Sequence, residues 1–253
     1  MDIAFPGLLE LLPFIAVGFA AQLIDGALGM AFKVISSTLL LSLGMPPAAA
    51  SATVHAVGSF TSAVAGVSHV LHGNVDWRLF GRLVAGGIVG GILGAYVLTE
   101  IPAETARPFV FAYLSLIALY LFWRAFRFEQ KERRPRYVAP LGTAGGFLDA
   151  AGGGGWGPVV TSNLLVQGAE PRKVIGTVNT AEFFVTVTVS ATFLATLGLQ
   201  AFTTAFLGLL IGGVAAAPVG GYAAKKIPAR PLLFTVAAVL LLTSGYGVYR
   251  ALA

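Results

Sequence analysis

Long apolar runs dominate this sequence, and they decide what the chain can fold into. Several of them, including residues 47–71, 79–98 and 174–197, reach the length of about 20 residues that a helix needs to cross a hydrocarbon core. Only 11% of the residues are charged, whereas a soluble domain carries roughly 25%. Too few polar side chains exist to cover a water-soluble globule, so the sequence predicts an all-α integral membrane protein.

The apolar runs fall into two sets, which a basic stretch separates. We place them at residues 7–24, 30–43, 47–71, 79–98, 108–126, 137–148, 156–166, 174–197, 202–223 and 231–249. The runs at 30–43, 137–148 and 156–166 are too short to cross a bilayer alone, which is typical of broken or re-entrant helices. We expect a polytopic helical bundle of about 8–10 segments.

The two sets share residues in the same order, which indicates an internal repeat. The pairs are Asp25 with Asp149, Gly29 with Gly153, Ser36 and Ser37 with Thr161 and Ser162, Pro46 with Pro171, and Gly86 and Gly87 with Gly212 and Gly213. An odd number of spans per half gives inverted-topology repeats, as in many secondary transporters. We therefore expect a first membrane repeat (1–126), a basic cytoplasmic linker (127–136) and a second membrane repeat (137–253).

Basic residues support this topology. If the N-terminus faces outward and each half crosses five times, the linker and most other basic side chains face the cytoplasm. The latter are Arg78, Arg82, Arg172, Lys173, Lys225, Lys226 and Arg230, whereas Arg107 and Arg250 face outward. This asymmetry is what the positive-inside rule predicts.

Glycines occur in two patterns. A run of four lies between two short segments: Gly152, Gly153, Gly154 and Gly155. Its amides can point at an anion before a half-helix, or the run can let neighbouring helices pack closely. Five others recur at helical spacing within one long span and are interpreted as a packing face: Gly86, Gly87, Gly90, Gly91 and Gly94.

Polar clusters lie inside otherwise apolar segments. They are Ser36, Ser37 and Thr38; Thr161, Ser162 and Asn163; and Asn179, Thr180 and Glu182, with His55 in the corresponding segment of the first half. Hydroxyl and amide groups can replace water around an oxyanion and still release it. We interpret them as substrate-binding candidates, with hydrogen bonds within or between helices as the alternative.

Ionisable side chains at bilayer depth each cost at least about 2.5 kcal/mol and need a reason. Asp25 and Asp149 either relay protons or cap the broken helices that follow them. Glu182 is a candidate for proton coupling or an ion pair, and Lys33 either attracts an anion or pairs with one of these carboxylates. His55 is interpreted as a polar pore residue, since no second metal ligand stands at a chelating spacing.

Three runs carry a family resemblance: DGALGMAFKVISSTLLLSLGMPPAAASA, GNVDWRLFGRLVAGGIVGGILGA and DAAGGGGWGPVVTSNLLVQGAEPRKVIGTVN. With them the chain resembles the sulfite exporter TauE/SafE family over nearly its whole length. The resemblance implies a multi-pass carrier of the bacterial inner membrane. Such a carrier moves small anions, such as sulfite or organosulfonates, with coupling to an ion.

Other functions are open to different degrees. A channel or a cation transporter remains an alternative, because buried carboxylates can serve a cation. An intramembrane enzyme has less support, since the sequence contains no H-E-x-x-H or G-x-S-x-G motif. We expect a small anion and membrane lipid as partners, with no cofactor, no bound metal and no nucleic acid. The sequence leaves the oligomeric state open, a homodimer included.

Overall fold

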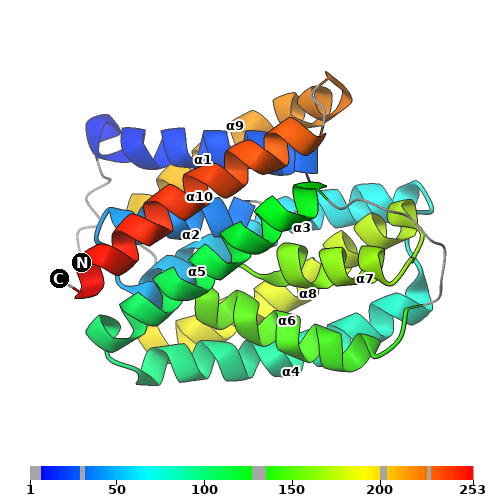
Figure 1. Cartoon of the computed structure of the whole chain (residues 1–253), viewed down its shortest axis with the longest axis horizontal. Coiled ribbons are helices and arrows are strands. Elements are labelled where there is room, and N and C mark those ends of the chain that lie inside the picture. The colour runs from blue at the N-terminus through cyan, green and yellow to red at the C-terminus, as the bar shows by residue number, and fades with distance from the viewer. Residues whose placement is uncertain (1–6, 29–31, 127–134, 200–203, 227–228, 253) are drawn as a thin grey trace.

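Helices form the regular structure of the chain in the computed structural model, which describes all residues except 1–6, 29–31, 127–134, 200–203, 227–228 and 253. The first half holds α1 (Leu8–Leu28), α2 (Phe32–Ser42), α3 (Pro47–Leu71), α4 (Trp77–Glu100) and α5 (Ala103–Phe126) (Figure 1). The second holds α6 (Val138–Gly152), the π-helix η1 (Trp156–Thr161), α7 (Ser162–Val166), α8 (Pro171–Leu197), α9 (Thr204–Lys226) and α10 (Ala229–Leu252). The all-α prediction is confirmed for the described residues, whereas Gly29 and most of the basic linker lie outside them.

Four helices in the described part of the chain are long and apolar enough to cross a membrane. They are Pro47–Leu71, Trp77–Glu100, Ala103–Trp123 and Lys173–Leu197. Their outward faces carry large apolar side chains, among them Leu93, Phe109 and Leu116, which are 52%, 71% and 64% exposed. Such faces are stable in lipid and not in water. The chain is therefore a helical membrane protein.

The short helices of the two halves end in the same turn. Met45 N donates to Leu40 O and Gly44 N to Leu41 O, while Ala169 N donates to Leu164 O and Gly168 N to Leu165 O, at 3.0 to 3.1 Å. Gly44 and Gly168 take positive φ angles of 92° and 90°, so each turn is a Schellman cap that glycine completes without strain. α3 and α8 then each begin at a proline, Pro47 and Pro171.

These turns correct the alignment of the first half of the chain with the second half. Pairing Pro46 with Pro171 is wrong by one residue, because Pro47 is the one that begins its helix and the spacing from Gly44 to Gly168 agrees with it. The sequence alone cannot tell which of two adjacent prolines stands at the helix start. In the corrected register Asp25 still matches Asp149, Lys33 matches Gly157, Ser37 rather than Ser36 matches Thr161, His55 matches Asn179, and Gly58 matches Glu182.

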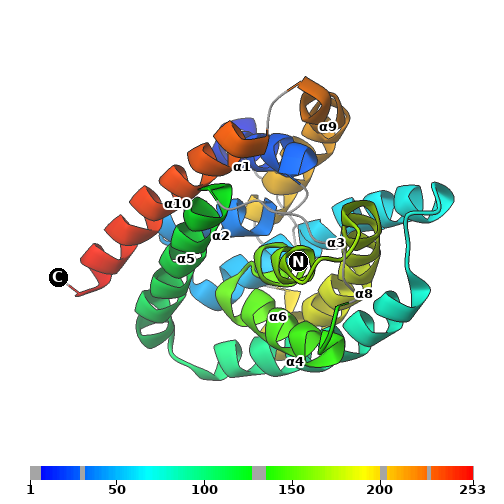
Figure 2. The ribbon, with the colours of Figure 1, turned by 45° about the vertical axis from the view of Figure 1, so that its right-hand side comes forward.

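Helices pack in pairs that join the two halves. α1 packs along α9 and α6 along α4, and these pairs lie at opposite edges of the bundle (Figures 1 and 2). α3 packs against α8, and α5 against α10. Gly66 lies against Thr180 whereas Ser59 faces Ser190, so α3 and α8 run antiparallel. Their crossing, beside the short helices, is where polar side chains gather.

Glycines let the edge pairs pack backbone to backbone. A Cβ on Gly86 would strike the carbonyl of Ala139 in α6, and one on Gly212 would strike the carbonyl of Ile15 in α1. Small residues give membrane helices this close approach. The predicted packing face of the segment 79–98 is confirmed.

Candidate functional site

Lys33 reaches from the first turn of α2 into the second half of the chain, where two carboxylates hold it. Its Nζ pairs with Asp149 Oδ2 in α6 and, at 2.8 Å, with Glu182 Oε1 in α8. The side chains of Lys33 and Asp149 are 7% and 0% exposed, and that of Glu182 is 18% exposed. A buried ammonium needs counter-charges close by, and here the expected ion pair forms twice.

Asp149 also caps the broken helix of the second half. Its Oδ1 accepts hydrogen bonds from the amides of Gly155 and Trp156 at 2.7 and 2.8 Å, at the start of η1. The helix dipole and its unpaired amides stabilise a carboxylate there. Asp25 accepts from the amide of Phe32, the first residue of α2, at 2.9 Å. One carboxylate oxygen of each aspartate, Oδ1, therefore caps a helix, which is one of the two roles that the sequence left open.

His55 links Asp149 to Ser51 in α3. His55 Nδ1 lies 2.8 Å from Ser51 O and 3.3 Å from Ser51 Oγ, whose own hydrogen is donated to Ala150 O at 2.6 Å. Both neighbours are acceptors, so Nδ1 carries a hydrogen. His55 Nε2 lies 3.0 Å from Asp149 Oδ2. The imidazole therefore bridges Ser51 and Asp149 next to the lysine.

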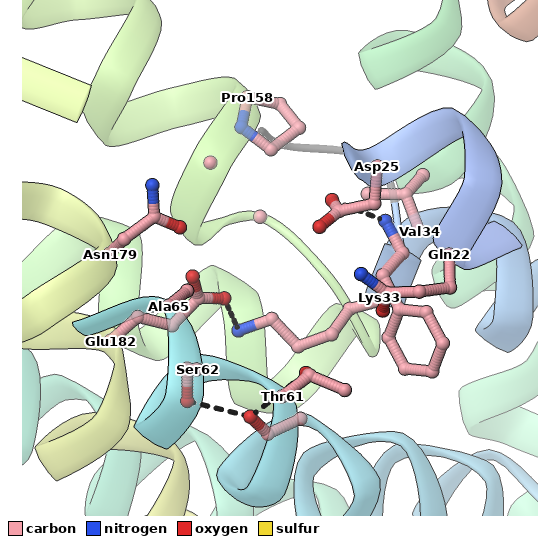
Figure 3. A pocket seen from close by; sticks show the side chains of 14 residues that line it. Gln22, Asp25, Lys33, Val34, Thr61, Ser62, Ala65, Pro158, Asn179 and Glu182 are labelled. Atoms are coloured by element: carbon pink, nitrogen blue, oxygen red, sulfur yellow. Dashed lines mark hydrogen bonds and ion pairs between the residues drawn. The ribbon is translucent and has the colours of Figure 1, made fainter. Parts of the chain in front are cut away.

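A pocket opens on the other side of Lys33 (Figure 3). The pocket is small, with a cavity volume of about 60 Å³. Its polar lining comes from α1, α2, α3 and α8: Gln22, Asp25, Lys33, Thr61, Ser62, Asn179 and Glu182. Glu182 meets Lys33 inside the pocket, whereas Asp149 and His55 lie behind the lysine. Lys33 thus lies between the pocket and the Asp149–His55 pair.

The four glycines serve close packing. Cβ atoms at Gly152 and Gly155 would strike the ring and hydroxyl of Tyr113, one at Gly153 would strike Ser37, and one at Gly154 would strike the backbone of Val34. Gly153 and Gly154 also have positive φ angles of 69° and 154°. The Gly155 amide points at Asp149, so a carboxylate of the protein occupies the place that the amide-cradle hypothesis gave to a substrate. Close packing therefore describes the contacts of all four glycines, and Gly155 also lines the pocket.

The predicted polar clusters reach the pocket only in part. Asn179 and Glu182 line it. Ser37 Oγ donates to Gly153 O and so joins the two halves. Thr38 and Thr180 donate to carbonyls of their own helices, at 2.8 and 2.7 Å, which is the alternative that sequence reasoning left open.

The remaining candidates lie away from the pocket lining. Ser36, Thr161 and Ser162 are buried in the surrounding core. Asn163 is exposed and accepts a hydrogen bond from Gln167 at 2.7 Å. Its substrate-binding role is not supported, because α7 turns Leu164 inward and Asn163 outward.

Sequence reasoning missed Ser51, Tyr113 and Gln22. Ser51 lies one helical turn before His55, a spacing that brings both to one face and was visible in the sequence. The Tyr113 hydroxyl donates to Gly154 O at 3.1 Å, a contact from α5 that no local pattern predicts. Gln22 is a buried amide in an apolar helix, and its position inside a long apolar run is a signal.

Comparison with known proteins gives one family. Residues 14–247 match the model of the family described as Sulfite exporter TauE/SafE. The chain is similar to a protein of Bacillus subtilis (strain 168) described as "Probable membrane transporter protein YtnM", with 42% identity over 226 residues, 86% of this chain and 75% of the relative. No solved structure matches the chain.

Proposed function

The chain belongs to the sulfite exporter TauE/SafE family and is a membrane transporter, and from this we propose that it is a secondary carrier of a small sulfur-containing anion. Sulfite and small organosulfonates are the proposed substrates, and the bacterial inner membrane is the proposed location. The single observation that carries the proposal is Lys33, a buried ammonium that lines a pocket at the break between two helices. A helix break beside a buried charge is the usual place of a carrier's binding site.

Glu182 is the group that a substrate anion displaces. It reaches Lys33 from the pocket side and is partly exposed, whereas Asp149 is enclosed and held by two amides and His55. An anion that enters the pocket can therefore replace Glu182 at the ammonium without breaking the cap of η1. A displaced carboxylate left charged in the bundle is unfavourable, so Glu182 takes up a proton as the anion binds. Proton and anion then move together.

The Asp149–His55 pair keeps Lys33 in place during this exchange. Asp149 Oδ2 contacts both the lysine and the imidazole, and Ser51 fixes the imidazole from the other side. The ammonium thus keeps one counter-charge when Glu182 leaves. Because Glu182 lines the pocket and Asp149 and His55 do not, we assign the coupling proton to Glu182 and the positioning of Lys33 to the pair.

Alternating access is proposed to arise from two inverted halves. The exchange of partners, with α1 on α9 and α4 on α6, supports this arrangement, as do the matching caps at Asp25 and Asp149. α3 and α8 occupy corresponding places in the two halves and run antiparallel, as corresponding helices of two inverted repeats do. In this proposal the halves rock about the pocket and expose it to each side in turn.

Uptake into proteoliposomes tests the function. Purified protein is reconstituted and offered labelled sulfite, sulfate, thiosulfate and a small sulfonate, with and without an inward proton gradient, against protein-free liposomes. The proposal predicts saturable uptake of a sulfur anion that the gradient drives above equilibrium. Uptake that does not saturate and shows no counterflow would indicate a channel, and movement of labelled monovalent cations without any anion would indicate a cation transporter.

A further inference from the structure

The exchange proposed at Lys33 determines how much charge a bound substrate can carry. In the empty site the Lys33 ammonium pairs with Asp149 and, at 2.8 Å, with Glu182. When an anion replaces Glu182 and Glu182 takes up a proton, one negative charge is lost beside the ammonium and the charge of the anion is added. An anion with one negative charge therefore leaves the charge of this cluster unchanged, whereas a dianion makes it more negative by one.

An additional negative charge is unfavourable here because the cluster is enclosed. Asp149 is fully buried and the Lys33 side chain is 7% exposed, and a charge in such surroundings needs a counter-charge close by. Lys33 is the only basic residue among the described residues that line the pocket. Its ammonium also stays paired with Asp149, so the second charge of a dianion has no cation of its own.

The hydroxyl groups of α3 also disfavour a fully deprotonated anion. Thr61 Oγ1 and Ser62 Oγ line the pocket, and both donate their hydrogens to Gly58 O, at 3.2 and 2.6 Å. These oxygen atoms therefore offer lone pairs to a ligand, and the oxygen atoms of a dianion offer only lone pairs as well. An anion that keeps a proton, such as hydrogen sulfite, can donate that proton to a hydroxyl oxygen.

Gln22 adds a neutral group to the lining. Its side chain is 7% exposed and lines the pocket, and its Oε1 accepts no hydrogen bond from any residue that the structure describes. Figure 3 shows the amide of Gln22 pointing into the pocket. An amide has two N–H donors besides its oxygen and carries no charge, so it can bind an oxyanion without requiring a second negative charge. One cation and neutral polar groups suit a monovalent ligand.

We propose that the carrier selects monovalent oxyanions, takes sulfite as hydrogen sulfite, and moves each anion together with one proton on Glu182 without net transfer of charge. This inference rests on the proposed function and adds the charge state of its substrate. The empty site holds ionised Glu182 beside Lys33, and the loaded site holds the anion there with Glu182 protonated. Both forms carry the same charge, so neither the loaded nor the empty step moves charge across the membrane.

Uptake under an imposed membrane potential tests this charge balance. Labelled sulfite is offered to proteoliposomes at equal, slightly acidic pH on both sides, while potassium gradients with valinomycin set the potential inside-negative, zero or inside-positive. The initial rate is expected to be the same at all three potentials. A rate that rises or falls with the potential overturns the proposal. Absence of any saturable sulfite uptake would instead refute the carrier itself, and this inference with it.

Two anions of the same size isolate the effect of charge. Methanesulfonate and sulfate are both tetrahedral ions of five heavy atoms, but the first carries one negative charge and the second carries two. Each is tested as an inhibitor of labelled sulfite uptake. Half-inhibition by methanesulfonate is expected at a concentration at least about tenfold lower than that of sulfate, because the second charge is buried without a partner. Equal inhibition, or stronger inhibition by sulfate, refutes the selection by charge while sulfite uptake itself stands.

Removing the exchangeable proton should make uptake sensitive to the potential. In Glu182→Gln the empty site has one positive charge more than the loaded site, so net uptake is expected to become faster when the inside is positive. Glu170→Gln, an exposed residue just before α8, is the matched control and should stay insensitive like the parent. Net uptake by Glu182→Gln that does not respond to the potential contradicts the proposed balance.

A second cation in the lining should admit dianions. Gln22→Lys adds an ammonium to the pocket and is expected to lower the half-inhibiting concentration of sulfate relative to that of methanesulfonate. Gln22→Met, which is neutral, is the control and should keep the parental preference. An unchanged preference in Gln22→Lys with a parental Tm overturns the role given to the charge of the lining. If Gln22→Lys does not fold, the comparison of the two anions on the parent decides.

Discussion

Lys33 and Asp149 form an ion pair in the interior of the bundle, although one belongs to the short helix α2 of the first half and the other to α6 of the second. Glu182 completes the pair from α8 at 2.8 Å. Three helices that are distant in the sequence thus meet at one ammonium. This contact makes the stability of the bundle and the chemistry of the pocket depend on the same residue.

Replacing the lysine should destabilise the protein strongly. Lys33→Met leaves two carboxylates in the interior without their ammonium, and breaking a buried pair from one side costs about 3–5 kcal/mol. A marked fall in apparent Tm is expected, together with loss of anion uptake. Lys173→Met, at the start of α8 where the half-buried ammonium donates to the Gly73 carbonyl at 2.7 Å, is the control and should lower the Tm much less than Lys33→Met.

A second substitution should separate stability from transport. In Lys33→Met/Glu182→Gln one of the stranded charges is gone, so part of the lost Tm should return. Uptake should stay absent because no ammonium remains for the anion. Recovered uptake in the double variant would show that Lys33 is structural only.

Neutralising Glu182 should uncouple the carrier. Glu182→Gln keeps a polar side chain in the pocket but cannot exchange a proton, so counterflow of labelled anion should persist while accumulation driven by a proton gradient is lost. Glu170→Gln, an exposed residue just before α8, serves as the matched control. Gradient-driven accumulation by Glu182→Gln at the parental level would assign the coupling proton to another group.

The glycine run should respond as a packing element. Gly153→Ala places a Cβ at a positive φ and against Ser37, which should destabilise the fold by at least about 1 kcal/mol from backbone strain alone. Gly81→Ala in α4, where the added Cβ meets no atom within 4 Å, should leave stability equal or improve it by up to about 1 kcal/mol. Equal apparent Tm values for the two variants would mean that the tight contact at Gly153 is absent.

Asn163 should be dispensable. It lies on the exposed face of α7 and bonds only to Gln167 among the contacts that the structure describes. Asn163→Ala is therefore expected to transport at the parental rate, whereas Asn179→Ala, which alters the pocket lining, should reduce affinity. A loss of transport in Asn163→Ala alone would restore the role that its sequence position suggested.

The sequence predicted those features that depend on interactions between residues close together in the chain. Apolar length predicted the helices, and the short segments at 30–43 and 156–166 correspond to the short elements α2 and η1–α7. The requirement that a buried charge has a partner predicted that Lys33 can pair with a carboxylate, with Asp25, Asp149 and Glu182 as the candidates. The alignment of the two halves was one residue out in this region. Pro46 and Pro47 match Pro171 equally well in sequence, and Ser36 and Ser37 match Thr161 equally well.

The features of the site that the sequence did not predict depend on contacts between residues that are distant in the sequence. Nothing near Lys33 in the sequence says that its partners are Asp149 and Glu182 rather than Asp25, since that choice depends on how α6 and α8 pack. The same holds for Tyr113, which fills the space that Gly152 and Gly155 leave. The amides of the glycine run looked available for an anion, yet Asp149 lies close enough to take them.

In the proposed carrier the substrate anion and Glu182 compete for Lys33. The most direct test is the affinity of purified protein for sulfite, measured by calorimetry under argon at constant pH, for the parent and for Glu182→Gln. Glu182→Gln is expected to bind sulfite at least about tenfold more tightly, equivalent to about 1.4 kcal/mol, because the internal competitor has lost its charge. Equal or weaker binding by Glu182→Gln, with normal binding by the Glu170→Gln control, would contradict it.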